Sequence, residues 1–285
     1  MQKPTILRAV SCAAVFTLSG IVQGEAKLPM VGEREWVGYY AVVVSKKYSF
    51  GITLDGQGKL LITGKDGKPM IHDAVNVDFT IEEVSPDGSI VGKTIIPDSL
   101  ESVQPASMKL KDVVIKGKAQ DDVLFEITAT ETGGGLLLGG KISSQGTVKS
   151  PLRFSIGVRF PEITPFFEKS SEKEKDEKKQ KREMEKLMKE ERLSVKWIDG
   201  KSEKVSIAEP IDGAGPTVSG PGVSFLSGEF SRLNRSKLEI MAAPNSAMVV
   251  KNDPSKALMM GFSVVWRADM AKDPQSKARL SLQVK

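Results

Sequence analysis

The chain has 285 residues, and its 41 basic side chains nearly balance its 36 acidic ones, so the formal net charge is only +5. This small excess argues against the strongly basic surface that nucleic-acid binding requires, and an aromatic content of 6% argues against base stacking. One histidine and one cysteine are too few for zinc and similar sites, which need several such ligands. We therefore expect no nucleic acid, no metal and no cofactor.

The N-terminus has the layout of a secretory signal peptide over residues 1–24. Lys3 and Arg8 form a basic start, and a short apolar run follows. Cleavage is expected near Gly24 or Ala26. The apolar run is shorter than the ~20 residues needed to span a bilayer. We expect an exported protein, periplasmic or extracellular, with no transmembrane segment in the mature chain.

The only cysteine and the only histidine limit the available chemistry. Cys12 lies inside the signal segment, so the mature chain is cysteine-free, which excludes disulfides and thiol catalysis. A Ser-His-Asp site would have to use His72, and a lone histidine in a loop is more typical of the polar surface. We assign no catalytic residue.

Residues 28–165 predict a β domain. Apolar and polar side chains alternate with a period of two, which is typical of a sheet with one solvated face. Asp-Gly pairs favour the positive φ that hairpin turns need. The clearest strand is PLRFSIGVRFP, and WVGYYAVVVS, VNVDFTIEEV, MKLKDVVIKG and VLFEITAT are consistent with it. The Asp-Gly turns of this region are at 55–56, 66–67 and 87–88, and two more are at 199–200 and 212–213.

Aromatic residues cluster once, at the start of this domain. Trp36, Tyr39 and Tyr40 lie in a single strand, and Tyr48 follows shortly after. Alternation places Trp36 and Tyr40 on one face of the strand and Tyr39 on the other. Those that stay exposed could stack on a sugar or a partner, so these four residues are the candidate ligand or partner site.

A glycine-rich stretch, GLLLGGK from Gly135 to Lys141, is similar in spacing to a phosphate-binding loop. Ile142 occupies the position where that loop needs a Ser or Thr hydroxyl, and the residues that follow do not predict a helix. We interpret the stretch as a turn leading into a short strand, Leu136–Leu138, and expect no nucleotide.

Residues 166–193 predict a charged helix or linker. The segment from 168 to 193 has neither Gly nor Pro, and Ser171 followed by Glu174 forms a capping box. Lys and Glu are spaced four residues apart, as in a solvated helix. This helix could be a spacer or a docking arm.

Residues 194–285 predict a second β-rich region, beginning with a hairpin at Asp199-Gly200. Its segment GFSVVWRA (261–268) and the segment RFSIGVRF (153–160) of the first region share the pattern Phe-Ser-apolar-x-apolar-Arg. The second region is therefore either a repeat of the first or a completion of the same sheet.

These elements predict a mainly β fold: an antiparallel meander, sandwich or curled sheet in one or two units, with one long charged α-helix inserted mid-chain. The expected function is non-enzymatic binding or scaffolding of a protein or other component of the cell envelope or extracellular space. Two alternatives stay open. One is a carboxylate-based hydrolase similar to a glycosidase, and the other is a carrier of an apolar ligand within a curled sheet.

Overall fold

The computed structural model describes residues 28–63, 74–160, 178–179, 182, 186, 192–206, 222–230, 236–251, 263–268, 272–273 and 276–285. Sixteen strands and three short 3-10 helices make up this part of the chain. The strands are β1 (Tyr39–Val44), β2 (Tyr48–Thr53), β3 (Gly58–Ile62), β4 (Val75–Val84), β5 (Ile90–Lys93), β6 (Asp112–Ala119), β7 (Val123–Glu131), β8 (Gly135–Ser144), β9 (Leu152–Arg159), β10 (Arg192–Trp197), β11 (Ser202–Ser206), β12 (Val223–Phe230), β13 (Ser236–Ala242), β14 (Ser246–Lys251), β15 (Ser263–Ala268) and β16 (Leu280–Val284). The 3-10 helices are η1 (Arg34–Trp36), η2 (Pro97–Ser99) and η3 (Gln120–Asp122). The prediction of a mainly β protein is confirmed.

Strand β4 shows why these residues form sheet. Its two faces differ: Val77, Phe79 and Ile81 are buried, while Asn76 and Asp78 on the opposite face are partly exposed. A period of two lets one strand serve a dry core and a polar outer face at the same time.

Asp-Gly pairs form the turns of three hairpins. Gly56, Gly88 and Gly200 have φ of +80°, +81° and +91° between β2 and β3, β4 and β5, and β10 and β11. A residue with a side chain would be strained at such angles, so glycine fixes these turns. The two other predicted turns, at 66–67 and 212–213, lie outside the described residues.

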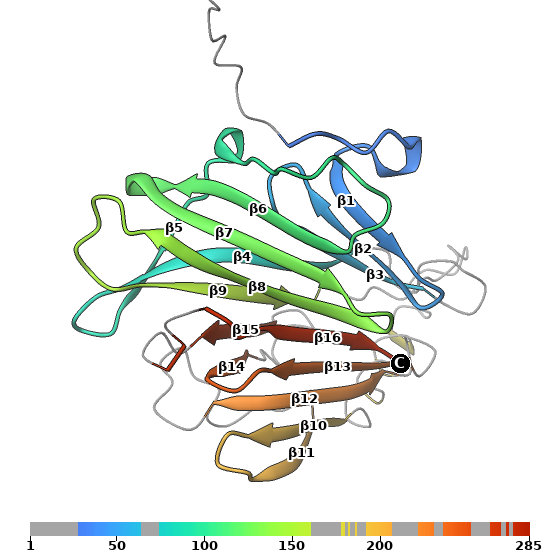
Figure 1. Ribbon diagram of the computed structural model, residues 1–285. Helices are drawn as coiled ribbons and strands as arrows, with labels where there is room; N and C mark the ends of the chain where they lie inside the picture. The colour runs from blue at the N-terminus through green and yellow to red at the C-terminus, as the bar shows by residue number, and fades with distance from the viewer. Residues whose placement is uncertain are drawn as a thin grey trace, which may run out of the picture.

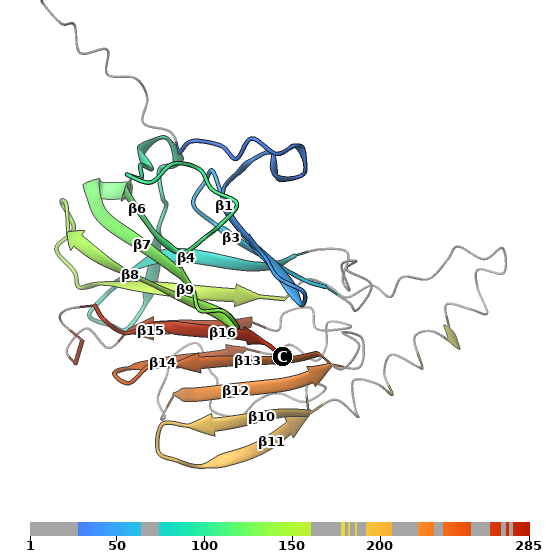
Figure 2. The ribbon, with the colours of Figure 1, turned by 45° about the vertical axis from the view of Figure 1, so that its right-hand side comes forward.

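The strands form one antiparallel path that turns back on itself. Its order is β1-β2-β3-β4-β9-β15-β14-β12-β13-β16-β8-β7-β6, with β5 added to β4 and the β10–β11 hairpin added to β12. Strands β6, β7 and β8 lie across β4 and β9 as a second layer (Figures 1 and 2). The two ends are bridged by the segment between β5 and β6, where the Val42 N–H donates to the Ser107 carbonyl and the Glu101 N–H to the Lys116 carbonyl, both at 2.9 Å. The sheet is therefore nearly closed.

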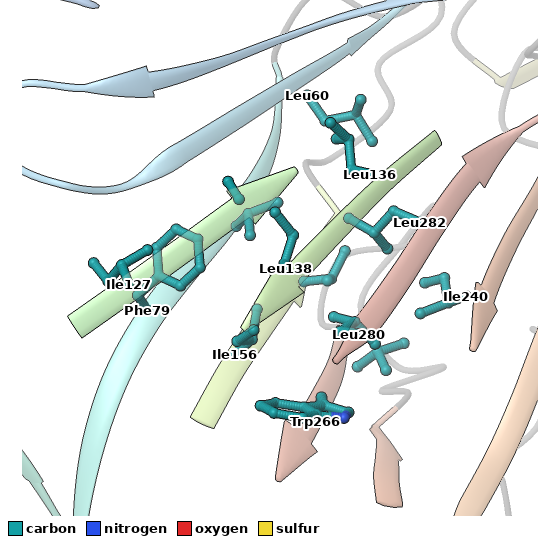
Figure 3. Close-up of a cluster of buried hydrophobic side chains, with 14 of the residues drawn as sticks. Leu60, Phe79, Ile127, Leu136, Leu138, Ile156, Ile240, Trp266, Leu280 and Leu282 are labelled. Atoms are coloured by element: carbon teal, nitrogen blue, oxygen red, sulfur yellow. The ribbon is translucent and has the colours of Figure 1, made fainter. Parts of the chain in front are cut away.

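Strands from before and after the charged segment pair directly with each other. Strand β15 pairs with β9, and β16 pairs with β8. The buried side chains form a single cluster in which Phe79 and Ile156 belong to the first region and Trp266 and Leu280 to the second (Figure 3). Burial of this shared apolar surface holds the two regions together.

The long charged helix is not an element of the described structure. Within residues 168–193 only positions 178, 179, 182 and 186 are described before β10, and each is helical. The predicted end of the helix is wrong, because Arg192 and Leu193 begin β10. Leu193 is buried and pairs with Val205 and Gly228, so its apolar side chain serves the sheet core.

Candidate functional site

The four candidate aromatic residues do not form one surface. Tyr40 and Tyr48 are buried in the sheet core. Trp36 lies in η1, ahead of the strand, and packs edge-to-face on Tyr39 with ring centroids 5.3 Å apart. The expectation that Trp36 shares a face with Tyr40 is wrong, because the chain turns at Gly38 with φ of +91° before β1 begins.

The buried tyrosines serve the fold. The Tyr40 hydroxyl lies 2.5 Å from Ser102 Oγ and donates to the Gln104 carbonyl at 3.1 Å, which fixes the segment that bridges the ends of the sheet. Burial raises the pKa of Tyr40 above its usual range, although the hydrogen bond with Ser102 opposes this. Burial, followed by the charge of Glu131, raises the pKa of Tyr48 in the same direction.

The glycine-rich stretch is part of strand β8, which is longer than the predicted three residues. Its residues pair with β7 on one side and, from Gly135 to Leu138, with β16 on the other. Backbone N–H groups engaged in a ladder cannot curl around a phosphate. The glycines allow close packing instead: a Cβ at Gly140 would clash with the Phe154 ring and the Glu126 carbonyl.

Several sequence candidates fall on residues whose structure is not described. Cys12 and His72 are among them. Within the described ranges, no three His, Cys, Asp or Glu side chains gather in a way that could hold a metal ion. The same part of the chain contains no helix long and apolar enough to cross a membrane.

A depression of about 780 Å³ lies at the corner where β13 passes into β14. It is open to solvent. The turn from Ala243 to Ser246 forms one wall, held by hydrogen bonds from the Ser246 N–H and Oγ to the Ala243 carbonyl at 3.2 and 2.6 Å. Among the described residues that line the depression, four are basic and none is acidic; the basic ones are Arg153, Lys196, Arg267 and Lys272.

Strand register explains how these side chains meet. Lys196 on β10, Phe225 on β12 and Met241 on β13 are directly opposite one another and share the outer face of the sheet. Arg267 on β15 is opposite Ala247 on β14. The depression lies between these two rows, so apolar side chains separate the lysine from the arginine.

Arg267 and Arg153 are held in place by one buried carboxylate. Arg267 donates to Glu82 twice, from Nε to Oε2 at 2.9 Å and from Nη2 to Oε1 at 3.0 Å. Arg153 Nε donates to Glu82 Oε2 at 2.6 Å. Two arginines on a single carboxylate leave a net positive charge, and the paired geometry limits the motion of both guanidinium groups.

The ionisation of Glu82 follows from this arrangement. Its burial alone would raise the pKa, but the hydrogen bonds and charge of Arg267, followed by those of Arg153, outweigh burial and hold the pKa of Glu82 below its usual range. Glu82 is therefore a carboxylate at neutral pH and is not a proton donor.

A second cluster of charges lies around Glu83, the residue that follows Glu82 on β4. Lys93 Nζ contacts Glu83 Oε2 at 2.5 Å and Asp121 Oδ2 at 2.8 Å, which ties β5 to the turn between β6 and β7. The hydrogen bonds with Asp121 and then Glu83 raise the pKa of Lys93. Both carboxylates bind the same lysine and join neighbouring elements of the sheet, so we interpret the cluster as structural.

Sequence analysis did not identify the residues of the depression. Period-two alternation did place Arg153 on the polar face of its strand, and the Phe-Ser-apolar-x-apolar-Arg match drew attention to the strand that contains Arg267. The missing information was the pairing of β9 with β15, which no local pattern contains.

The chain matches no protein-family model, and no curated protein sequence matches it. The interpretation of the depression rests on its own residues.

Proposed function

We propose that the protein is an exported, non-enzymatic β-sheet protein that binds a component of the cell envelope or extracellular space through this depression. The observation that carries the proposal is the composition of the described lining, which combines four basic groups with exposed apolar side chains and has no acidic group. Basic and apolar groups together favour association with an anionic, partly apolar partner.

A carboxylate-based hydrolase is less well supported. Glycoside hydrolysis needs two carboxyl groups that face each other about 5–10 Å apart, one of them able to donate a proton. Glu82 binds two of the arginines that line the depression, and both of its oxygens accept hydrogen bonds from them. Its lowered pKa opposes the role of a general acid.

A carrier of an apolar ligand within the sheet is also less well supported. Such a carrier would hold its ligand between the two layers. In the described core that space is occupied by large, fully buried side chains, including Phe79 and Trp266 (Figure 3). Phe154 is also fully buried.

Photo-crosslinking from the depression tests the binding proposal. Replacing Met241, which is 46% exposed, by p-benzoylphenylalanine should give one discrete adduct in cells that make the protein. Adding Lys196→Glu should abolish that adduct, because it reverses a charge in the lining. The same probe at Val103, which is 92% exposed and outside the depression, is the matched control. Identical adducts from both positions, or none from Met241, would contradict the proposal.

Export is tested separately by fusion and by mass. We expect alkaline phosphatase fused after residue 30 to be active, and a fusion lacking residues 1–24 to be inactive, because that enzyme needs an oxidising compartment. The intact mass of the native protein should correspond to a chain beginning at Glu25 or Lys27. A full-length chain found in the cytoplasm would reject export.

A further inference from the structure

We propose that the partner presents an extended acidic segment to the depression, with two carboxylates separated by an apolar residue in the order acid–x–apolar–x–acid. This proposal rests on the proposed function and specifies the class of partner. It is argued from the spacing of the basic groups, the apolar surface between them and the geometry of extended chains.

The first step is the spacing of the charges. A row of directly opposite residues runs across four strands, from Trp197 on β10 through Val223 on β12 and Met248 on β14 to Trp266 on β15. Lys196 precedes Trp197 in the chain, and Arg267 follows Trp266, so the two basic residues lie beside the two ends of this row. Three strand spacings of ~4.8 Å therefore separate their backbones, or about 14 Å along the sheet. Arg267 is held by Glu82 of β4, which lies on the side of β15 away from Lys196, so its guanidinium does not turn toward the lysine. Two acidic groups therefore fit the pair better than one.

The second step is the surface between the charges. Phe225 and Met241 are next to each other across β12 and β13, and Ile198 follows Lys196 by two residues on the same side. Met241 is 46% exposed and Ile198 is 53% exposed, although both line the hollow. Burying such side chains against an apolar group is favourable by ~25 cal/mol per Å².

The third step matches a ligand to this pattern. An extended chain rises ~3.3 Å per residue, so residues four apart are about 13 Å apart. Residues i, i+2 and i+4 also point to the same face. Carboxylates at i and i+4 can therefore reach Arg267 and Lys196, while an apolar side chain at i+2 meets the floor formed by Phe225 and Met241.

The fourth step is the readiness of the arginine end. Glu82 already fixes Arg267, so little side-chain entropy is lost when an acidic group arrives. A guanidinium has five N–H donors, and Arg267 gives only those on Nε and Nη2 to Glu82. Donors on Nη1 can still be offered to an incoming carboxylate.

The experiment uses the intact mature protein and three fluorescein-labelled peptides. The peptide GSEALAESG has the proposed spacing. GSELAAESG has the same composition with the leucine moved to the opposite face, and GSQALAQSG lacks the charges. We expect GSEALAESG to bind more tightly than either control by about tenfold, and more weakly as salt is raised. Fluorescence anisotropy of a trace of each labelled peptide, titrated with the protein up to about 1 mM, measures this.

Substitutions inside and outside the depression test whether the peptide binds there. Lys196→Glu and Met241→Glu should each weaken GSEALAESG at least about tenfold, whereas Lys46→Glu, which makes the same charge change at the exposed β1–β2 turn, should leave affinity unchanged. Circular dichroism of each variant should match that of the original protein.

Three outcomes would overturn this proposal. They are equal binding of GSEALAESG and GSELAAESG, no binding up to the highest concentration, and stronger binding of a single-stranded oligonucleotide or of anionic lipid vesicles at the same site. If Met241 still crosslinks to a discrete partner in cells while the peptides fail to bind, the acidic segment is rejected and the binding function stands. If both experiments fail, the depression is not a binding site.

Discussion

Replacing Glu82 by alanine should lower the free energy of unfolding by about 3–5 kcal/mol, the usual effect of removing one partner from a buried ion pair. The side chain of Glu82 is only 10% exposed, and those of Arg267 and Arg153 are 13% and 24% exposed. Removing the carboxylate leaves two guanidinium groups that repel each other and are largely shielded from bulk water. Denaturation in urea, followed by circular dichroism, measures the change.

A second ion pair on the same two strands provides the control for this experiment. Asp78 on β4 pairs with Arg159 on β9, so it links the same two strands as Glu82 and Arg153, but the side chain of Arg159 is 61% exposed. Exposed pairs contribute only about 0–1 kcal/mol. If Asp78→Ala destabilises the protein as much as Glu82→Ala, burial is not what gives Glu82 its effect.

The same carboxylate predicts a pH dependence. The pKa of Glu82 is lower in the folded protein than the ~4.3 expected when unfolded, so its stabilising effect is complete above that value. The effect is lost as pH falls through the folded pKa. The difference in unfolding free energy between the original protein and Glu82→Gln should therefore be largest near neutral pH and shrink below pH ~4. A difference that grows on acidification would contradict this assignment.

Trp266→Ala should destabilise the protein by about 3–5 kcal/mol, the range for removing a buried Trp or Phe. Trp266 is fully buried and is the largest such side chain in the described core. It lies opposite Ile156 of the first region on one side and Met248 of the second region on the other. The resulting cavity would remove packing on both sides of the sheet join (Figure 3). Urea denaturation again measures the loss.

Trp266→Phe is the informative companion of that substitution. The indole N–H of Trp266 is buried and has no hydrogen-bond partner within the described part of the chain. Phenylalanine removes this unsatisfied donor along with some packing, so we expect a cost of only about 1–2 kcal/mol. A loss equal to that of alanine would mean that the N–H makes a bond that stabilises the fold.

Most of the secondary structure could be predicted from the sequence. Alternation in VNVDFTIEEV predicted a strand that coincides with β4, and Asp-Gly pairs located three hairpin turns correctly. Alternation also correctly separated Tyr39 from Tyr40. It could not place Trp36, because a 3-10 turn precedes the strand and no periodicity applies there.

The candidate site depended on pairing between distant segments. Glu82 is 71 residues from Arg153 and 185 residues from Arg267 along the chain. Each residue alone is a charged group on the polar face of a strand, a position where charges are common. Only the register of β4, β9 and β15 brings the three together. No local pattern specifies that register, so the depression could not be found from sequence.

The join between the two regions also affects how the chain is made. Leu136 and Ile156 find their partners Leu282 and Trp266 only when the last segments of the polypeptide have been synthesised. Until then the nascent chain has open edges on β8 and β9, and unpaired edges of this kind are prone to aggregate. A ribosome that stops shortly before β15 would release a product that cannot close its sheet, so a holding chaperone is most needed at that stage of synthesis.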